Sequence, residues 1–119
     1  MRTAAELRFV IDFDVIDTGA FRSAVAEAVA VSRDEPGTLL YDWYIDEAGA
    51  KARLYEAYES AAAIQAHAEG PVFTEIGPRL FESSRVAHID AYGDPEVMKI
   101  AEILGPVTLW GEPFEAPSL

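Results

Sequence analysis

The chain has 119 residues, half of them hydrophobic, no cysteine and a formal net charge of −12, which indicates one globular domain and excludes disulfides, thiolate nucleophiles and cysteine-ligated zinc. The strong negative charge repels phosphate groups, so we expect neither nucleic acid nor an anionic membrane as a partner. No apolar run approaches the roughly 20 residues of a membrane span, and the N-terminus lacks a signal-peptide pattern, so we expect a cytoplasmic protein.

The first third of the chain predicts a strand followed by a helix. Residues 7–15 alternate between apolar and polar side chains, which is typical of a strand with one buried face. Asp17 or Thr18 can cap the helix that follows, and a Glu-Pro-Gly turn at residues 35–37 ends it. The apolar stripe of this helix consists of Phe21, Val25, Ala28 and Val29.

Two further strands are predicted at residues 38–45 and 51–58, joined by a turn that contains Gly49. Successive side chains of a strand point to opposite faces, so each strand divides into two sets. In the first strand one face carries Leu39, Tyr41, Trp43 and Ile45. In the second strand we expect one set to face the helices of its own subunit and the other to face away: inward Leu54, Glu56 and Tyr58, outward Tyr55 and Ala57.

The next part of the chain predicts two helical segments and a fourth strand. Ser60 can cap a helix at residues 61–69, which a glycine closes. A second helical segment begins at Pro71, and the Gly-Pro pair at residues 77–78 kinks or splits it. Residues 85–93 then predict a strand.

Residues 94–119 predict an additional helix and a short strand. Asp94 as the cap, a proline at the first helical position and Gly105 at the end make the helix signature clear. The strand at residues 107–110 needs a sheet edge to pair with. Because the faces of the sheet are assigned to other elements, we expect this extension to cross to a second subunit, with Trp110 as an anchor.

The element order is β-α-β-β-α-β followed by an extra helix and strand. It is the ferredoxin-like split βαβ order, so the expected fold class is α+β with an antiparallel sheet. We expect a single domain over residues 1–119, with a core at about residues 5–93 and the extension at 94–119. Both faces of the first three strands carry large apolar side chains, and a homodimer in which two sheets pack together buries the second face.

Four segments carry a resemblance to a known family: EPGTLLY at residues 35–41, LYEAYES at 54–60, the alanine-rich helix that contains His67, and GPVF at 70–73. They resemble the antibiotic biosynthesis monooxygenase domain family, in which the aromatic residue two places after the glutamate is usually Trp and is Tyr58 here. The resemblance implies a homodimer of ferredoxin-like subunits that forms a dimeric α/β barrel. It also implies a pocket in each subunit between sheet and helices.

The chemistry of this family is diverse. Some members oxygenate polyketide-derived phenols or quinols with O2 and use neither metal nor flavin, whereas others bind and degrade haem. Haem-degrading members use an Asn, a Trp and a His, but this chain has no Asn and carries Tyr58 at the usual Trp position. The resemblance thus favours a cofactor-independent monooxygenase that oxidises a quinol or polycyclic phenol. A stress-associated dimeric barrel protein that binds a small ligand without turnover is the alternative, and haem binding or degradation is a weaker one.

His67, Glu56 and Tyr58 are the candidate catalytic residues. His67 lies on the inward stripe of its helix, where a neutral imidazole can take a proton from a phenol. Glu56 and Tyr58 share one strand face, and a carboxylate buried there needs a partner, for which His67 and Arg79 are the candidates. Alternatively, His67 is a core histidine that ties the helix to the sheet, and Glu56 belongs to a structural hydrogen-bonded pair.

An aromatic set drawn from two strands and one helical segment suits a flat aromatic ligand. The candidate substrate-binding residues are Tyr41, Trp43, Phe73 and Phe81, together with Arg79. The alternative for the aromatic residues, above all for Trp43, is a place in the core and the dimer interface.

The sequence carries little sign of a metal or a cofactor. His88 and Asp90 share a strand face, but two such residues are a weak metal signal without further ligands. No P-loop, dinucleotide-binding glycine pattern or G-x-S-x-G motif occurs. We therefore expect no metal and no cofactor, and as partners a small aromatic molecule and a second copy of the chain.

Overall fold

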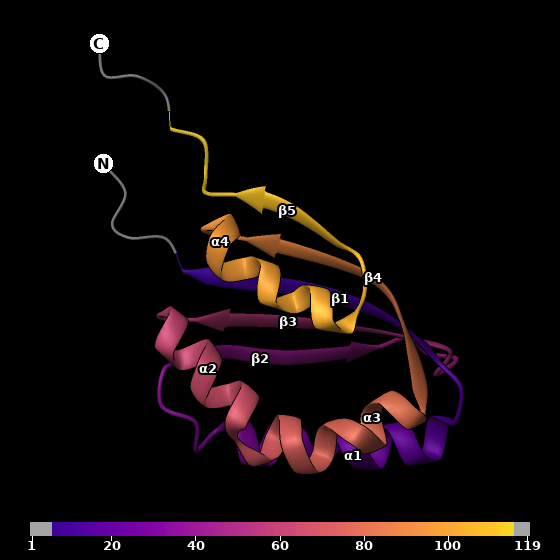
Figure 1. Ribbon diagram of the computed structural model, residues 1–119. Helices are drawn as coiled ribbons and strands as arrows, with labels where there is room; N and C mark the ends of the chain where they lie inside the picture. Colours follow the sequence, from indigo (N-terminus) through magenta and orange to yellow (C-terminus); the bar gives the residue numbers. More distant parts are fainter. Residues whose placement is uncertain (1–5, 116–119) are drawn as a thin grey trace.

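The computed structural model describes residues 6–115 and contains one five-stranded mixed sheet (Figure 1). Its strands are β1 (Leu7–Val15), β2 (Thr38–Ile45), β3 (Lys51–Tyr58), β4 (Ser84–Tyr92) and β5 (Val107–Gly111), in the order β2-β3-β1-β4-β5. The first four strands are antiparallel to their neighbours, whereas β5 lies parallel to β4. The predicted α+β fold with a ferredoxin-like core is confirmed.

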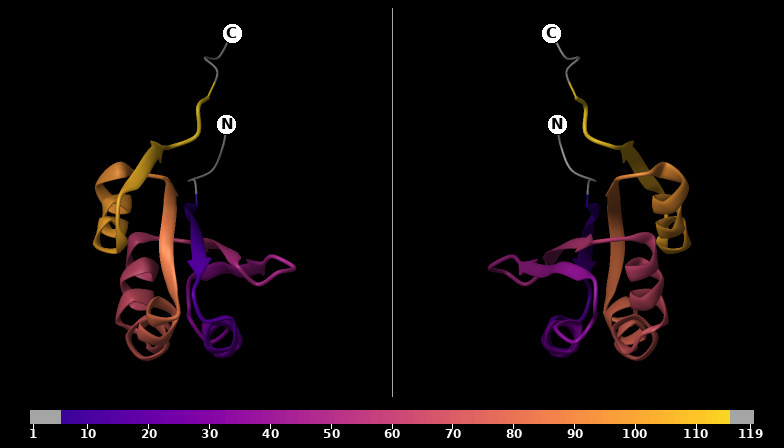
Figure 2. Two further views of the ribbon diagram at one scale, coloured as in Figure 1. Left: turned by 90° about the vertical axis from the view of Figure 1, so that its right-hand side faces the viewer. Right: turned by 90° about the vertical axis from the view of Figure 1, so that its left-hand side faces the viewer.

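Helical segments pack against one face of the sheet, which we call the inner face; the opposite face is the outer face (Figure 2). They are α1 (Thr18–Ser32), α2 (Ala61–Glu69), the π-helical turn η1 (Val72–Ile76), α3 (Gly77–Glu82), α4 (Pro95–Met98) and the 3₁₀ helix η2 (Lys99–Leu104). Asp17 and Ser60 are the N-caps of α1 and α2, because their side chains accept the N–H groups of Ala20 and Ala63. Within residues 6–115 no helix has the length and apolar character to cross a membrane.

The helical segment after α2 is split where the Gly-Pro pair predicts it. Pro78 has no N–H to donate, so the regular ladder cannot run through it. The chain instead forms the π-helical turn η1, closed by the Gly77 N–H donating to the carbonyl of Val72, and then continues as α3. Phe73 from η1 and Phe81 from α3 consequently lie with their ring centroids 6.2 Å apart, on the side that faces the sheet.

Side chains of β3 alternate between the two faces of the sheet as predicted. Leu54, Glu56 and Tyr58 are buried on the inner face, while Tyr55 is partly exposed on the outer face. The outward Ala57 is also buried. Glu56 therefore enters the interior of the subunit from the middle of the sheet.

One residue of β2 departs from the predicted alternation. The register between β2 and β3 shifts between Thr38 and Leu40, so Leu39 lies in an irregularity of the strand. Leu39 is exposed instead of sharing the inner face with Tyr41 and Trp43. The prediction for Leu39 is wrong, because a local change of register is not visible in an apolar pattern.

The C-terminal extension packs on its own subunit, whereas we predicted that it crosses to a second one. β5 pairs with β4 of its own chain, from Ile89 opposite Val107 onward, and the helical segment before it packs on the inner face beside α2 (Figure 2). The Trp110 indole N–H donates to Asp90 at 2.8 Å, and its ring stacks on Tyr92. The edge of β4 was free in the four-stranded core, and the extension occupies this edge within the same subunit.

The helix of the extension also differs from the predicted one. It begins at the Asp94 cap as an α-helix and continues as the 3₁₀ helix η2, which has fewer residues per turn. Met98 of α4 and Ala101 of η2 are buried, whereas Ile100 is 43% exposed and Ile103 is 80% exposed. The extension thus presents two apolar side chains at the surface beside α2 and η1.

Candidate active site

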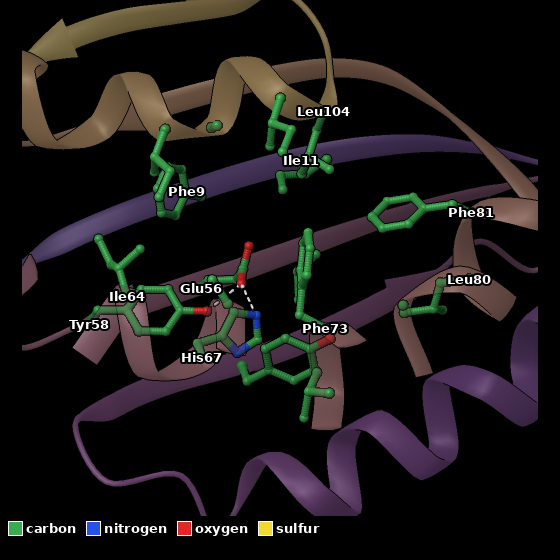
Figure 3. A pocket seen from close by; sticks show the side chains of 18 of the residues that line it. Phe9, Ile11, Glu56, Tyr58, Ile64, His67, Phe73, Leu80, Phe81 and Leu104 are labelled. Carbon is green, nitrogen blue, oxygen red and sulfur yellow. Dashed lines mark hydrogen bonds and ion pairs between the residues drawn. The ribbon is translucent and has the colours of Figure 1, made fainter. Parts of the chain in front are cut away.

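A cavity of about 100 Å³ lies between the inner face of the sheet and the helical segments α2, η1, α3 and η2 (Figure 3). Its walls are almost wholly apolar, with Phe9, Ile11 and Leu54 among the side chains from the sheet. The exposed Ile100 and Ile103 also line it, so they mark the side on which it opens to solvent. Such an enclosure suits an apolar ligand.

Glu56 is the only acidic residue that lines this cavity within the part of the chain that the structure describes. Its Oε1 accepts a hydrogen bond of 2.5 Å from the Tyr58 hydroxyl and lies 3.7 Å from Nε2 of His67. Figure 3 shows its other carboxyl oxygen pointing away from Tyr58 and His67, into the cavity. Glu56 thus offers one carboxyl oxygen to whatever occupies the cavity.

The surroundings of Glu56 disfavour its charged form. Burial raises the pKa of Glu56, although His67 and the Tyr58 hydroxyl lower it in part. Burial, followed by the charge of Glu56, raises the pKa of Tyr58 and of Tyr41 far beyond the usual range. Both tyrosines therefore stay protonated and act as hydrogen-bond donors, while Glu56 is a stronger base than an ordinary carboxylate once it has lost its proton.

His67 lies in the last turn of α2 with only 12% of its side chain exposed. Its Nε2 faces Glu56, and its Nδ1 lies 2.9 and 3.1 Å from the two carboxyl oxygens of Glu35. The predicted neighbourhood of His67 and Glu56 is present. Because both ring nitrogens face carboxyl groups, His67 contacts a ligand's reacting atoms less directly than Glu56 does.

Glu35 is a site residue that the sequence prediction missed. It lies in the loop between α1 and β2, and its side chain is 11% exposed. The same loop forms the Glu-Pro-Gly turn, where Glu35 was interpreted as part of a helix stop and was given no role in the site. A loop has no periodicity from which the direction of a side chain can be inferred, so only its membership of the family-like segment at residues 35–41 marked it.

The predicted aromatic residues Tyr41, Trp43, Phe73 and Phe81 all line the cavity. The His67 ring lies 5.9 Å from Tyr41 and 6.3 Å from Phe73, measured between centroids. The indole N–H of Trp43 is buried without a hydrogen-bond partner within residues 6–115. A buried donor left without an acceptor is costly.

Arg79 does not belong to this site. Leu80 occupies the buried side of α3, and the neighbouring Arg79 points to solvent, where it pairs with Glu27 of α1. Of the two candidate partners of Glu56, Arg79 is therefore the wrong one. Its expected place among the substrate-binding residues is also wrong, because Arg79 is absent from the cavity walls. His88 and Asp90 form an exposed pair 3.0 Å apart, and the described residues hold no cluster of three or more potential metal ligands.

The family model described as antibiotic biosynthesis monooxygenase matches residues 17–78, which is more than half of the chain. The chain belongs to this family. The matched range contains Glu35, Glu56, Tyr58 and His67, so the polar residues of the candidate site lie within the family domain. No curated protein matches the chain by sequence.

Several solved structures are similar to this family member. MupZ from Pseudomonas fluorescens has a TM-score of 0.74 and 16% identity, with 100% of this chain and 92% of MupZ covered. SnoaB, a cofactor-independent oxygenase from Streptomyces nogalater, has a TM-score of 0.62 and 19% identity, with 72% and 91% covered. A third structure, described as an antibiotic biosynthesis monooxygenase, has a TM-score of 0.58 and 25% identity, with 71% of this chain and 94% of that chain covered. The match to MupZ spans the C-terminal extension as well as the family domain.

Proposed function

We propose that this protein is a cofactor-independent monooxygenase that oxidises a quinol or a phenolic, polyketide-like substrate with O2. The observation that carries the proposal is the carboxyl oxygen of Glu56, which points into an apolar cavity without a partner among residues 6–115. The family and the likeness to SnoaB, described as a cofactor-independent oxygenase, support the reaction class.

In this reaction Glu56 takes the proton of the phenolic hydroxyl, and the resulting phenolate supplies electrons to O2. A ring carbon that carries hydrogen gains one oxygen atom and becomes a carbonyl. The second oxygen atom leaves as water with the two hydrogens that the substrate loses. One phenol and one O2 thus give one quinone and one water, and the substrate is the only electron donor.

The other residues of the site orient the reacting groups. Tyr58 and His67 hold the carboxyl group of Glu56 from one side, so its second oxygen stays directed at the cavity. The hydroxyl of Tyr41 donates to no group within the described residues and can donate to an oxygen of the substrate. Phe73, Phe81 and Trp43 flank the ring plane.

The size of the cavity limits what enters it. A cavity of about 100 Å³ is comparable to engineered cavities of about 150 Å³ that bind benzene, so it admits a single ring. A polycyclic substrate therefore inserts its reacting ring and extends past Ile100 and Ile103 into solvent. The substrate class we propose is accordingly one whose phenolic ring lies at the end of the molecule.

We also propose that the protein is a homodimer in which the outer faces of two sheets pack together. The outer face carries four aromatic side chains at its surface, which we call the outer aromatic patch: Tyr44, Tyr55, Tyr92 and Trp110. A monomer that leaves such a patch in water is unfavourable. The implied dimeric α/β barrel follows from this arrangement.

A second candidate function is the binding of a small apolar ligand without turnover. The observation that favours it is the limited volume of the cavity, which lies below the roughly 300 Å³ at which ligand sites usually begin. In that case the buried Glu56 contributes specificity for a hydroxyl group and no proton transfer.

Oxygen consumption with a panel of quinols and hydroxynaphthalenes separates the two functions. We expect uptake of one O2 per substrate by the wild-type protein, and a fall of about 100-fold or more in Glu56→Gln and a smaller fall in His67→Ala. Glu75→Gln removes a carboxylate at an exposed position and keeps the wild-type rate. Ligands that bind without any oxygen uptake would contradict the monooxygenase and support the binding protein.

A further inference from the structure

The imidazole of His67 lies between two buried carboxyl groups. Glu35 approaches Nδ1 at 2.9 Å and Glu56 approaches Nε2 at 3.7 Å, and both acidic side chains are at most 11% exposed. Within residues 6–115 neither Glu35 nor Glu56 has an ion pair with Lys or Arg. His67 is therefore the cationic partner available to both, and its protonation state decides the charge of the whole cluster.

The contacts favour a proton on each side of the ring. An ionised Glu35 only accepts hydrogen bonds, so Nδ1 of His67 carries a hydrogen and donates it. A bare Nε2 facing an ionised Glu56 would place two lone pairs against each other. At 3.7 Å this contact favours one further proton, either on Nε2 of His67 or on the carboxyl group of Glu56.

We propose that Glu35 is a positioning residue that keeps this proton on His67 and thereby leaves Glu56 as the carboxylate that faces the cavity. The value of this arrangement for catalysis rests on the proposed function, since only a deprotonated Glu56 can take the proton of a phenol. Glu35 acts through His67 and touches no ligand, because it does not line the cavity.

The charges and dipoles around His67 are consistent with this role. Glu35 comes from the α1–β2 loop, Glu56 and Tyr58 from β3 and Tyr41 from β2, and none of these groups is cationic. The position in the last turn of α2 favours a positive charge, because the C-terminal end of a helix is electronegative.

Burial of the Glu56 carboxyl group opposes this proton placement. The charge of Glu35 also raises the pKa of Glu56. Glu35 nevertheless lies closer to the ring of His67 than Glu56 does, at 2.9 Å against 3.7 Å, so it attracts the shared proton toward His67. Glu35 itself is held by the hydroxyl of Thr38, which donates to Oε1 at 3.0 Å.

Nuclear magnetic resonance at pH 7 tests the proposal without a substrate. The ¹⁵N shifts of His67 report which ring nitrogens carry hydrogen, and the ¹³C shift of the Glu56 side-chain carboxyl reports its ionisation. The chain has two histidines, so the exposed His88 serves as an internal reference. In the wild type we expect both nitrogens of His67 to be protonated and Glu56 to be ionised.

Glu35→Gln removes the charge and keeps an amide oxygen that can accept from His67 and Thr38. We expect the ratio of doubly to singly protonated His67 to fall about tenfold or more and the Glu56 carboxyl to shift toward its protonated form. Glu75→Gln, an exposed change of equal charge, leaves both signals at their wild-type positions.

Two results overturn the proposal. One is the finding that His67 of the wild-type protein lacks hydrogen on Nε2 at pH 7. This measurement does not depend on whether a variant folds. The other is an unchanged His67 in Glu35→Gln. Neither result bears on the proposed monooxygenase activity, which the oxygen-consumption assay tests separately. Conversely, a protein that consumes no oxygen can still show the predicted shifts, so the two failures are distinguishable.

Discussion

At the scale of single residues, the hydrogen bond from Tyr58 to Glu56 distinguishes two otherwise similar buried tyrosines. Tyr58 donates to the Glu56 carboxyl at 2.5 Å, whereas the Tyr41 hydroxyl donates to no side chain within the described residues. We expect Tyr58→Phe to lower the free energy of unfolding by about 1.5–3 kcal/mol, because Glu56 loses its donor. Tyr41→Phe, the matched control, changes it by less than about 0.5 kcal/mol. Equal losses in urea denaturation would show that the hydrogen bond is not stabilising.

Glu56 also predicts how stability depends on pH. Its pKa is raised in the folded protein by burial, so the native state binds an extra proton above the unfolded value of about 4.3. The contribution of Glu56 to stability is therefore fully present below that pH and is lost as the pH rises through the folded pKa. We expect the free energy of unfolding of Glu56→Gln to lack this decrease with rising pH, whereas Glu75→Gln shows the same decrease as the wild type. Parallel wild-type and Glu56→Gln curves between pH 4 and 8 would contradict the assignment.

The roles of these residues were only partly predictable from the sequence. Strand alternation placed Glu56 and Tyr58 on one inner face, and helical periodicity placed His67 beside them. Arg79 was misplaced because a charged residue next to a buried leucine can point either way, and here Glu27 pairs with it at the surface. Glu35 was missed because the direction of a loop side chain depends on tertiary packing alone.

At the scale of elements, the Glu-Pro-Gly turn holds the α1–β2 loop against α2 through a glycine. Gly37 has φ of +84°, and a Cβ there would lie 2.7 Å from the Cβ of Ala63 in α2. Gly111 has a similar φ of +76°, with no atom within 4 Å of the added carbon.

These two glycines separate backbone strain from close packing. We expect Gly111→Ala to cost about 1–3 kcal/mol from strain alone. Gly37→Ala should cost more in thermal denaturation, because the loop that carries Glu35 must also move away from α2. Equal costs would mean that the loop tolerates this displacement.

Most element boundaries follow from local chemistry. Asp17 and Ser60 cap their helices as predicted, and the Gly-Pro pair splits the segment after α2. The extension was misplaced because a pattern of apolar residues says that a strand needs an edge but not which edge is free. The change from α4 to the tighter η2 was also invisible in the sequence, and it determines which side chains face the mouth of the cavity.

At the scale of the whole molecule, the outer aromatic patch predicts the state of association. We expect light scattering to report a dimer at micromolar concentration, with more than about 2,000 Å² buried in total. Tyr55→Asp should weaken the dimer, because it replaces an aromatic side chain of the contact by a second carboxylate beside Asp42. Ile16→Asp, an exposed apolar residue elsewhere, should not. A wild-type protein that is monomeric under these conditions would contradict the proposed dimeric barrel.

The element order predicted the ferredoxin-like core of the molecule, and the family match agrees with it. The volume of the cavity was not predictable, because it depends on how closely Phe73, Phe81 and the extension approach the sheet. The substrate's size and the site's chemistry are thus set by different parts of the chain. The polar groups come from the family domain, and Ile100 and Ile103 of the extension bound the mouth.

The central claim is that Glu56 removes the proton of a phenol bound in the cavity. Its most direct test is an absorption spectrum of a bound hydroxynaphthalene, recorded without oxygen so that no turnover intervenes. We predict that the wild-type protein binds the ligand with the spectrum of the ionised naphtholate at pH 7, whereas Glu56→Gln binds it with the spectrum of the neutral form. A ligand that binds in its neutral form to the wild-type protein, or that ionises equally in Glu56→Gln, would contradict this account.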